Sequence, residues 1–276
     1  MTQPLLVLDA HYLCHRAFWS QRNLAWQGVP TGVIFGFLKS IGMLKAEFQT
    51  DRIAFCFESP ASLRRKIFPA YKQKREMKKL EPDVAAARLE LLRQIDLLRD
   101  DYLPTMGFRN IFCFGGYESD DIMARIGQRD DWVILVTSDQ DLYQCLRPNL
   151  SIYAANEKKL ITIKQFTKTY GIKPSQWAVM KALAGCSTDG VPGIGRVGET
   201  TALKWIRSGQ APSLTPEQKK IVHRNRLLVE LPFDGCPTPE IRSDDIDRNG
   251  WDVICSNLGM KSLLGRYPIY GQPSLI

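Results

Sequence analysis

Long apolar runs, paired cysteines and histidine clusters are all missing from this sequence of 276 residues. It contains no uncharged apolar stretch of about 18 residues, the length typical of a membrane-spanning helix. The N-terminal segment reaches a charge too early for a secretory signal peptide. The seven cysteines include no Cys-x-x-Cys pair, which argues against a zinc site or a disulfide framework. We therefore expect a cytoplasmic protein with reduced thiols and no membrane partner.

Positive charge is concentrated in one segment. The net charge is +8 and the isoelectric point is near 9.1. Clustered basic residues favour nucleic acid because they release counterions from its phosphates, and Phe68 and Tyr71 in this segment can stack on unpaired bases. A solvated basic helix or loop without a ligand is the alternative interpretation. Residues 61–80 contain one acid, Glu76, and the basic residues Arg64, Arg65, Lys66, Lys72, Lys74, Arg75, Lys78 and Lys79.

The first half of the chain alternates between strand-like and helix-like patterns. Apolar runs predict strands at 5–9, 52–58, 109–114, 132–138 and 151–155, and three- and four-residue spacing predicts helices at 31–48, 83–103 and 118–129. This order indicates an α/β fold with a parallel sheet covered by helices. Ligands of such sheets bind beyond the carboxyl ends of the strands. Acids stand at or beyond four of these ends: Asp9, Glu58, Glu118 and Asp139.

Carboxylates crowd into a short part of the chain. Five of them fall within 24 residues, namely Glu118, Asp120, Asp121, Asp139 and Asp141. Each one alone could cap a helix, but helix capping needs one acid per helix start and the remainder would repel one another. An all-oxygen donor set without a histidine pattern is typical of Mg²⁺ or Mn²⁺. The pattern therefore predicts a divalent metal site.

The character of the sequence changes after about residue 160. Residues 163–171 and 173–185 have helical patterns, and a glycine-rich turn at 190–198 precedes another helix that carries Lys204 and Arg207. Glycines in such a turn let backbone amides approach a phosphate closely. We expect a helix-hairpin-helix at about 174–208 that grips a DNA backbone without reading its sequence. The predicted division is an α/β core at 1–160, with the basic segment at about 60–82, and a helical DNA-binding region at 161–276.

Taken together, the motifs resemble those of the 5′ nuclease family, the 5′-3′ exonucleases and flap endonucleases that include the N-terminal domain of bacterial DNA polymerase I. The matching stretches run through most of the chain: LLVLDAHYLCHRAF, the segment from Ser62 to Arg75, GYESDDIMA, VTSDQDLYQ, YGIKPSQWAVMKALAG and DGVPGIGRVGETTA. The resemblance implies a PIN-like parallel-sheet core, a C-terminal helix-hairpin-helix region, and metal-dependent hydrolysis of DNA to 5′-phosphate products.

The resemblance also assigns roles to residues. The metal-binding positions are Asp9, Glu58, Glu118, Asp120, Asp121, Asp139, Asp141 and Asp189. The clamp that handles the 5′ strand corresponds to Arg64, Tyr71, Lys72 and Arg75, of which Lys72 and Arg75 are the expected catalytic cations. Duplex DNA binds at Gly193, Gly195, Gly198 and Lys204, where a K⁺ ion is also expected. The implied mechanism uses two ions, the first held mainly by Asp9, Glu58, Glu118 and Asp120.

Four positions depart from the family pattern. Glu58 stands where aspartate is usual, and Gly190 and Arg196 replace a commoner asparagine and glycine in the turn. Cys186 replaces the first aspartate of a Gly-Asp-x-x-Asp pattern, which implies a weakened second metal site.

The expected protein is a monomeric, stand-alone nuclease of a bacterium or a phage, acting in replication, repair or primer removal. Its partners are DNA with a 5′ end, nick or flap, and RNA–DNA hybrids. Two alternatives remain at this point: a DNA-binding protein that keeps the scaffold without cutting, and a ribonuclease with a similar acidic site.

Overall fold

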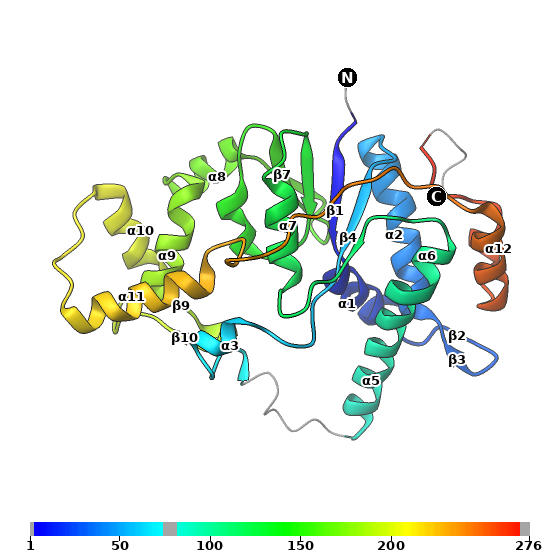
Figure 1. The fold of residues 1–276 in the computed structure, drawn as a ribbon, viewed down its shortest axis with the longest axis horizontal. Helices are drawn as coiled ribbons and strands as arrows, with labels where there is room; N and C mark the ends of the chain where they lie inside the picture. The colour runs from blue at the N-terminus through cyan, green and yellow to red at the C-terminus, as the bar shows by residue number, and fades with distance from the viewer. Residues whose placement is uncertain (1–2, 74–81, 271–276) are drawn as a thin grey trace.

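A six-stranded sheet forms the centre of the protein (Figure 1). The computed structural model describes residues 3–73 and 82–270. The strands run in the order β5-β4-β1-β6-β7-β8, and all neighbours are parallel except β7 and β8. Their bounds are β1 Leu5–Asp9, β4 Ile53–Cys56, β5 Ile111–Phe112, β6 Val133–Val136, β7 Leu150–Ala154 and β8 Lys159–Ile161. The predicted α/β class and its parallel sheet are confirmed, and the antiparallel β8 is an addition.

Two hydrophobic layers cover the two faces of the sheet. Because successive side chains of a strand point to opposite faces, Leu6 and Leu8 of β1 enter one layer and Leu5 and Val7 enter the other. The first layer contains α1 (Ala10–Gln21), α2 (Gly32–Phe48) and α5 (Pro82–Leu97). The second contains α7 (Ser119–Gly127), α8 (Ile163–Tyr170) and α9 (Trp177–Ala184). Because both faces of β1 are packed, the position of its last residue, Asp9, is fixed by the two hydrophobic layers.

Several short elements were not predicted. A two-stranded hairpin, β2 (Ala25–Trp26) and β3 (Val29–Pro30), separates α1 from α2. Helix α5 continues through the π-helix η1 (Leu98–Tyr102) into α6 (Leu103–Thr105). The short α3 (Arg64–Ile67) opens the basic segment, of which Lys74, Arg75, Lys78 and Lys79 lie outside the described residues. Nothing in the described part of the chain is helical, apolar and long enough to span a bilayer.

The second half of the chain extends the molecule in two directions. Helices α10 (Glu199–Ser208) and α11 (Pro216–Val229) lie at one end of the long axis, and α12 (Arg248–Asn257) lies at the other (Figure 1). A two-residue pair of strands, β9 (Gly185–Cys186) and β10 (Val191–Pro192), follows α9. The 3-10 helices are η2 (Gln140–Cys145), η3 (Pro174–Gln176), η4 (Ser187–Asp189) and η5 (Lys261–Leu263).

Helix α12 belongs to the core and not to the end of the molecule that carries α10 and α11. Trp251 is fully buried, donates from Nε1 to the carbonyl of Leu263 at 2.8 Å, and joins the same hydrophobic layer as α1, α2 and α5. Ile254 and Cys255 are buried in that layer as well. The last part of the chain thus returns to the α/β core, so the predicted boundary at residue 160 separates segments that share one hydrophobic layer.

Candidate metal centre and nucleic-acid interface

Acidic side chains converge where the parallel strands end. Asp9 is the last residue of β1, Glu58 lies two residues beyond β4, and Asp139 lies three residues beyond β6. Since β4, β1 and β6 are adjacent and parallel, their ends meet at one edge of the sheet. Glu118 and Asp120 reach the same edge from the start of α7, which packs on β1 and β4. The convergence predicted from strand order is therefore present.

Asp9 is held from two sides. Its Oδ1 accepts a hydrogen bond from the Tyr12 amide at 3.0 Å and caps α1, and its Oδ2 accepts from the Thr137 hydroxyl at 3.1 Å. Burial, together with the nearby charges of Glu58 and Asp139, raises the pKa of Asp9 to about 7. An isolated carboxylate is therefore disfavoured here, and a cation would stabilise it.

This raised pKa makes stability depend on pH. Because the folded-state pKa lies above the ordinary value of 3.8, the folded protein binds more protons than the unfolded chain between pH about 4 and 7, so stability is lost as the pH rises through that range. We expect Asp9→Asn to remove this loss, which is at most about 1.4 kcal/mol per pH unit. Urea unfolding between pH 4.5 and 7 in a chelator is the measurement. The exposed Asp130→Asn is the control, and parallel profiles for wild type and Asp9→Asn would contradict the assignment.

Glu118 is surrounded by donors from the basic segment. Its Oε1 accepts from the Ser62 hydroxyl at 3.0 Å, and its Oε2 accepts from the Tyr71 hydroxyl at 3.1 Å and from Lys72 Nζ at 2.7 Å. Burial alone would raise the pKa of Glu118, but the charges of Lys72 and Arg64 lower it below the ordinary value. Glu118 is therefore an ionised carboxylate at neutral pH, available as a ligand.

Asp120 has an unsatisfied oxygen. Its Oδ1 is buried and forms no hydrogen bond with any described residue. Burial first, and then the charges of Asp121 and Glu118, raise its pKa well above the ordinary value. A buried carboxylate oxygen without a partner, next to other carboxylates, is the donor that a hard divalent cation takes. The residues at this edge thus fit an all-oxygen metal site.

Asp121 and Arg64 are bound to each other instead of to a ligand. Asp121 is completely buried, and Arg64, of which 2% is exposed, forms a bidentate pair with it at 2.7 and 2.8 Å. Asp121 also accepts from the amides of Glu118 and Phe233, and Arg64 Nε donates to the Leu228 carbonyl at 2.8 Å. Both residues are fully engaged. This differs from the metal-binding role expected for Asp121 and the DNA contact expected for Arg64, because neither side chain faces the solvent.

A second group of ligand atoms lies beside the first. Single ligand atoms of Asp141, Cys186 and Asp189 lie within 4.8 Å of one another. Lys181 of α9 forms an ion pair with Asp141 at 2.9 Å. Asp139 is exposed, and its Oδ1 accepts from the Asp141 amide at 2.8 Å, which caps η2. Asp141 and Asp189, predicted as ligands from distant parts of the sequence, are thus brought together with Cys186.

Glu58 and Tyr71 differ in their exposure to solvent. Glu58 is exposed, and its amide donates to His11 Nδ1 at 3.1 Å. Tyr71, expected on the DNA clamp, is buried and 4% exposed, and burial first, followed by the charge of Glu118, raises its pKa. Its ring is therefore not presented for stacking on a base; its hydroxyl supports Glu118.

Lys72 connects the basic segment to both groups of acids. Its amide donates to the Asp189 carbonyl at 2.8 Å, while its ammonium contacts Glu118. The backbone at Lys72 has a φ of 55°, in the left-handed region that residues other than glycine rarely adopt. The two anchors hold this conformation and place a cation at the acidic edge. Arg75, the other expected catalytic cation, lies outside the described residues.

The glycine-rich turn joins α9 to α10 as a hairpin. A side chain at Gly193 would meet the backbone of Ala184 at 2.2 Å, so only glycine allows this close approach. Gly195 and Gly198 are exposed with open space around them, and no side chain caps α10 at Gly198. Arg196 adopts a φ of 65° where the family pattern has glycine. Arg196 in the turn and Lys204 on α10 are both exposed, so this region presents backbone amides and cations to the solvent.

Three polar supports of the site were not predicted from the sequence. They are Ser62, Thr137 and Lys181, which contact Glu118, Asp9 and Asp141 respectively. Thr137 lies one residue past β6, so its proximity to the end of the neighbouring β1 follows once the strand order is known. No local motif marks Ser62 or Lys181, because each meets its partner only through tertiary packing.

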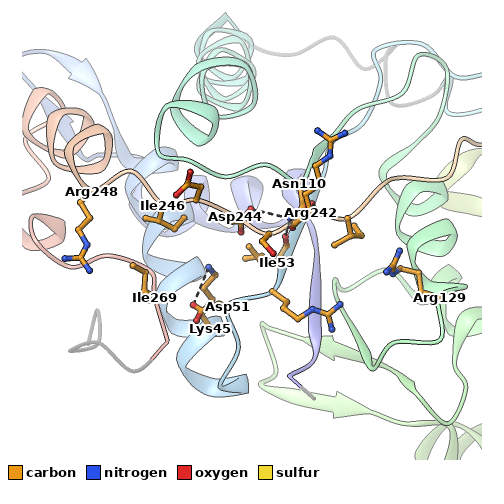
Figure 2. Close-up of a pocket in the computed structure, with 14 residues that line it drawn as sticks. Lys45, Asp51, Ile53, Asn110, Arg129, Arg242, Asp244, Ile246, Arg248 and Ile269 are labelled. Carbon is orange, nitrogen blue, oxygen red and sulfur yellow. Dashed lines mark hydrogen bonds and ion pairs between the residues drawn. The ribbon is translucent and has the colours of Figure 1, made fainter. Parts of the chain in front are cut away.

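A separate hollow of about 500 Å³ lies under residues 241–248 and contains none of the predicted site residues (Figure 2). Its lining contains both basic and acidic side chains, such as those of the Lys45–Asp51 ion pair at 3.9 Å. Asn110 donates to the carbonyls of Arg242 at 2.7 Å and Ile53 at 3.1 Å. The hollow borders the start of β4, whereas the acids gather where the strands end, so the two sites are distinct.

Comparisons with known proteins agree with this geometry. A family model described as the 5′-3′ exonuclease, N-terminal resolvase-like domain, matches residues 4–171. The 5′-3′ exonuclease of Bacillus subtilis is 32% identical over 216 residues, which cover 74% of this chain and 69% of that protein. The thermostable DNA polymerase I of Thermus thermophilus is 30% identical over 293 residues. That match covers 98% of this chain and 34% of the polymerase, so the chain spans about a third of the length of this relative.

Solved structures share the fold. The 5′-exonuclease of bacteriophage T5, in a structure with bound zinc, superposes with a TM-score of 0.70 at 18% identity and covers 83% of this chain and 90% of its own. Flap endonuclease-1 of Methanococcus jannaschii superposes with a TM-score of 0.58 at 15% identity, covering 94% and 87%. At these identities the likeness establishes the architecture.

Proposed function

The chain belongs to the 5′-3′ exonuclease family, and on that premise we propose that it is a divalent-metal-dependent 5′-3′ exonuclease with flap-cutting activity on DNA. The orphaned Oδ1 of Asp120 carries this proposal, since it lies at the acidic edge of the sheet and lacks the partner that a cation would supply. Mg²⁺ or Mn²⁺ suits the oxygen donors of Asp9, Glu58, Glu118 and Asp120. The products are nucleotides or short oligonucleotides with 5′-phosphates.

The residues of the acidic site have different roles in the proposed hydrolysis. When bound, a divalent ion supplies a water of lowered pKa and polarises the phosphate. Asp9, Glu118 and Asp120 would hold it, and the hydrogen bonds of Tyr12 and Thr137 keep Asp9 oriented. Lys72 places a fixed ammonium beside Glu118, where it neutralises charge that develops on the scissile phosphate. Asp121 and Arg64 position the start of α7 and the basic segment relative to each other.

DNA binding is assigned to the hairpin and the basic segment. The exposed amides near Gly195 and Gly198 donate hydrogen bonds to backbone phosphates of a duplex, and Lys204 adds charge. Such contacts position the DNA without reading its sequence. The substrates we propose are duplexes with a 5′ end, nick or flap, including those with an RNA primer, and a K⁺ ion at the hairpin would assist binding. We further propose that the protein acts as a monomer in a bacterial or phage-infected cytoplasm.

The proposed function is tested by metal-titrated digestion of four labelled substrates: blunt duplex, nicked duplex, 5′ flap and single strand. Mg²⁺-dependent release of 5′-phosphate products from duplexes with a 5′ end, nick or flap supports the proposal. Tight binding of the same substrates without release at any Mg²⁺ or Mn²⁺ concentration would identify a non-cleaving DNA-binding protein. An RNA strand and an RNA-primed duplex are digested alongside these four, and preferential release from RNA would identify a ribonuclease.

Lys72 is expected to affect turnover more than binding. We expect Lys72→Met to lower the single-turnover rate by roughly a hundredfold, because it removes a charge placed at the reacting phosphate, while duplex affinity changes less than about twofold. Lys204→Met is the matched variant on the hairpin. It is expected to weaken duplex binding severalfold and to reduce its salt dependence without changing the single-turnover rate at saturation. Equal losses of rate and affinity in Lys72→Met would count against its catalytic role.

A further inference from the structure

Cys186 occupies the centre of a compact ligand group. Its Sγ lies with one carboxylate oxygen each from Asp141 and Asp189, and the three atoms are within 4.8 Å of one another. They come from three segments: Asp141 from η2, Cys186 from the end of β9, and Asp189 from η4. The short β9–β10 pair and the Cys186 Sγ contacts to Thr188 Oγ1 at 3.0 Å and to Asp189 Oδ2 at 3.5 Å fix the sulfur in place.

Two further features distinguish this group from a solvated acidic surface. Cys186 and Asp189 are each 8% exposed, so the donors are shielded from bulk water. The ammonium of Lys181 already approaches Asp141 at 2.9 Å. The structure therefore places a positive charge at the rim of this group, which is what its carboxylates require.

At the place where the family resemblance puts a second metal ion, beside Asp141 and Asp189, we propose that the Cys186 sulfur selects a borderline or soft divalent ion, such as Zn²⁺, Co²⁺ or Cd²⁺, over Mg²⁺. Thiolate ligands favour these ions, whereas Mg²⁺ demands a near-octahedral set of oxygens. Binding replaces the proton on Cys186 with the metal and releases that proton to the solvent. The proposed function supplies only the location of this site beside the nuclease centre; its selectivity follows from the chain's own donors.

The direct test is binding, measured on the full chain with Mg²⁺ in excess to saturate oxygen-only sites. Calorimetry with Cd²⁺ in buffers of different ionisation enthalpy reports affinity and proton release, and Co²⁺ titration reports thiolate ligation through its sulfur-to-metal charge-transfer band. We expect wild type to bind Cd²⁺ with release of a proton and to show the Co²⁺ band. Cys186→Ser is expected to lose the band and at least about tenfold in Cd²⁺ affinity.

Matched variants separate ligation from other effects of substitution. Cys255→Ala, which removes a buried thiol of α12, is expected to leave both signals unchanged. Cys186→Asp is expected to lose the Co²⁺ band and to gain affinity for Mn²⁺ at this site. Lys181→Met is expected to strengthen Cd²⁺ binding severalfold, since it removes the cation that competes for Asp141. Equal Cd²⁺ affinity and an unchanged band in wild type and Cys186→Ser would overturn the proposal.

Failure of this inference is distinguishable from failure of the proposed nuclease function. If Mg²⁺-dependent DNA hydrolysis occurs while Cys186→Ser binds Cd²⁺ as wild type does, only the sulfur site is wrong. If no substrate is hydrolysed but the Co²⁺ band depends on Cys186, the proposed sulfur-containing metal site is supported and the proposed nuclease function is wrong.

Discussion

Replacing Asp120 with asparagine is expected to reduce Mg²⁺-dependent hydrolysis by roughly a thousandfold and, at the same time, to stabilise the metal-free protein. The loss of activity follows because the buried Oδ1 no longer belongs to a carboxylate that can hold the ion. The gain follows because burial and the neighbouring acids raise the pKa of Asp120, so its ionised form destabilises the folded state at neutral pH. We expect the melting temperature in a chelator to rise by roughly a few degrees.

The two effects are measured on the same samples. Single-turnover digestion of a 5′-labelled duplex gives the rate, and thermal unfolding with and without Mg²⁺ gives the stability. Asp130→Asn, an exposed acid three residues past the end of α7, is the matched control and is expected to change neither. Added Mg²⁺ is expected to stabilise wild type and to have little effect on Asp120→Asn. Hydrolysis at the wild-type rate in Asp120→Asn would falsify the assignment of the metal centre.

The largest loss of stability is expected for Arg64→Met. This change leaves Asp121 as a buried carboxylate without its bidentate partner, a situation that costs about 3–5 kcal/mol. It also leaves the Leu228 carbonyl without the Nε donor and removes the guanidinium that packs over the Phe233 ring. We expect a large drop in the midpoint of urea unfolding at neutral pH, with activity lost through the displaced α7.

Partial rescue separates this mechanism from simple loss of packing. Arg64→Met combined with Asp121→Asn removes the stranded charge while its one side-chain oxygen keeps an acceptor for either the Glu118 or the Phe233 amide. The double variant is therefore expected to be more stable than Arg64→Met alone. Arg88→Met, on the exposed face of α5, controls for loss of an arginine and is expected to be neutral. A double variant no more stable than the single one would show that the charge of Asp121 is not the cause.

Much of the fold could be predicted from local pattern. The continuous apolar runs around β1, β4 and β6 identify buried parallel strands because both faces of these strands are covered, as the zero exposure of Leu6, Val7 and Leu8 shows. The antiparallel β8 and the β2–β3 hairpin are short and partly exposed, and they lack such a signal. The return of α12 to the core was not predictable, since periodicity shows that a helix has an apolar face but not which surface covers it.

The sequence predicted which acidic residues lie in the site better than it predicted the role of each one. The crowding of Glu118, Asp120 and Asp121 identifies the region, but the three acids lie in one turn of helix and point in different directions. Asp121 therefore turns inward to Arg64 while Asp120 keeps an oxygen without a partner. A basic run in a sequence also cannot show which of its members is buried, and among the members that the structure describes Arg64 is the one that packs inside.

The position of α12 has a consequence for biosynthesis. The layer over one face of β1 is incomplete until Trp251 has been translated and its indole has paired with Leu263. A nascent chain on the ribosome that has emerged only as far as residue 240 therefore lacks the part of this layer that α12 supplies. Acquisition of the native state is thus expected to wait for nearly the whole chain, and chaperones that recognise apolar segments have a long interval in which to bind.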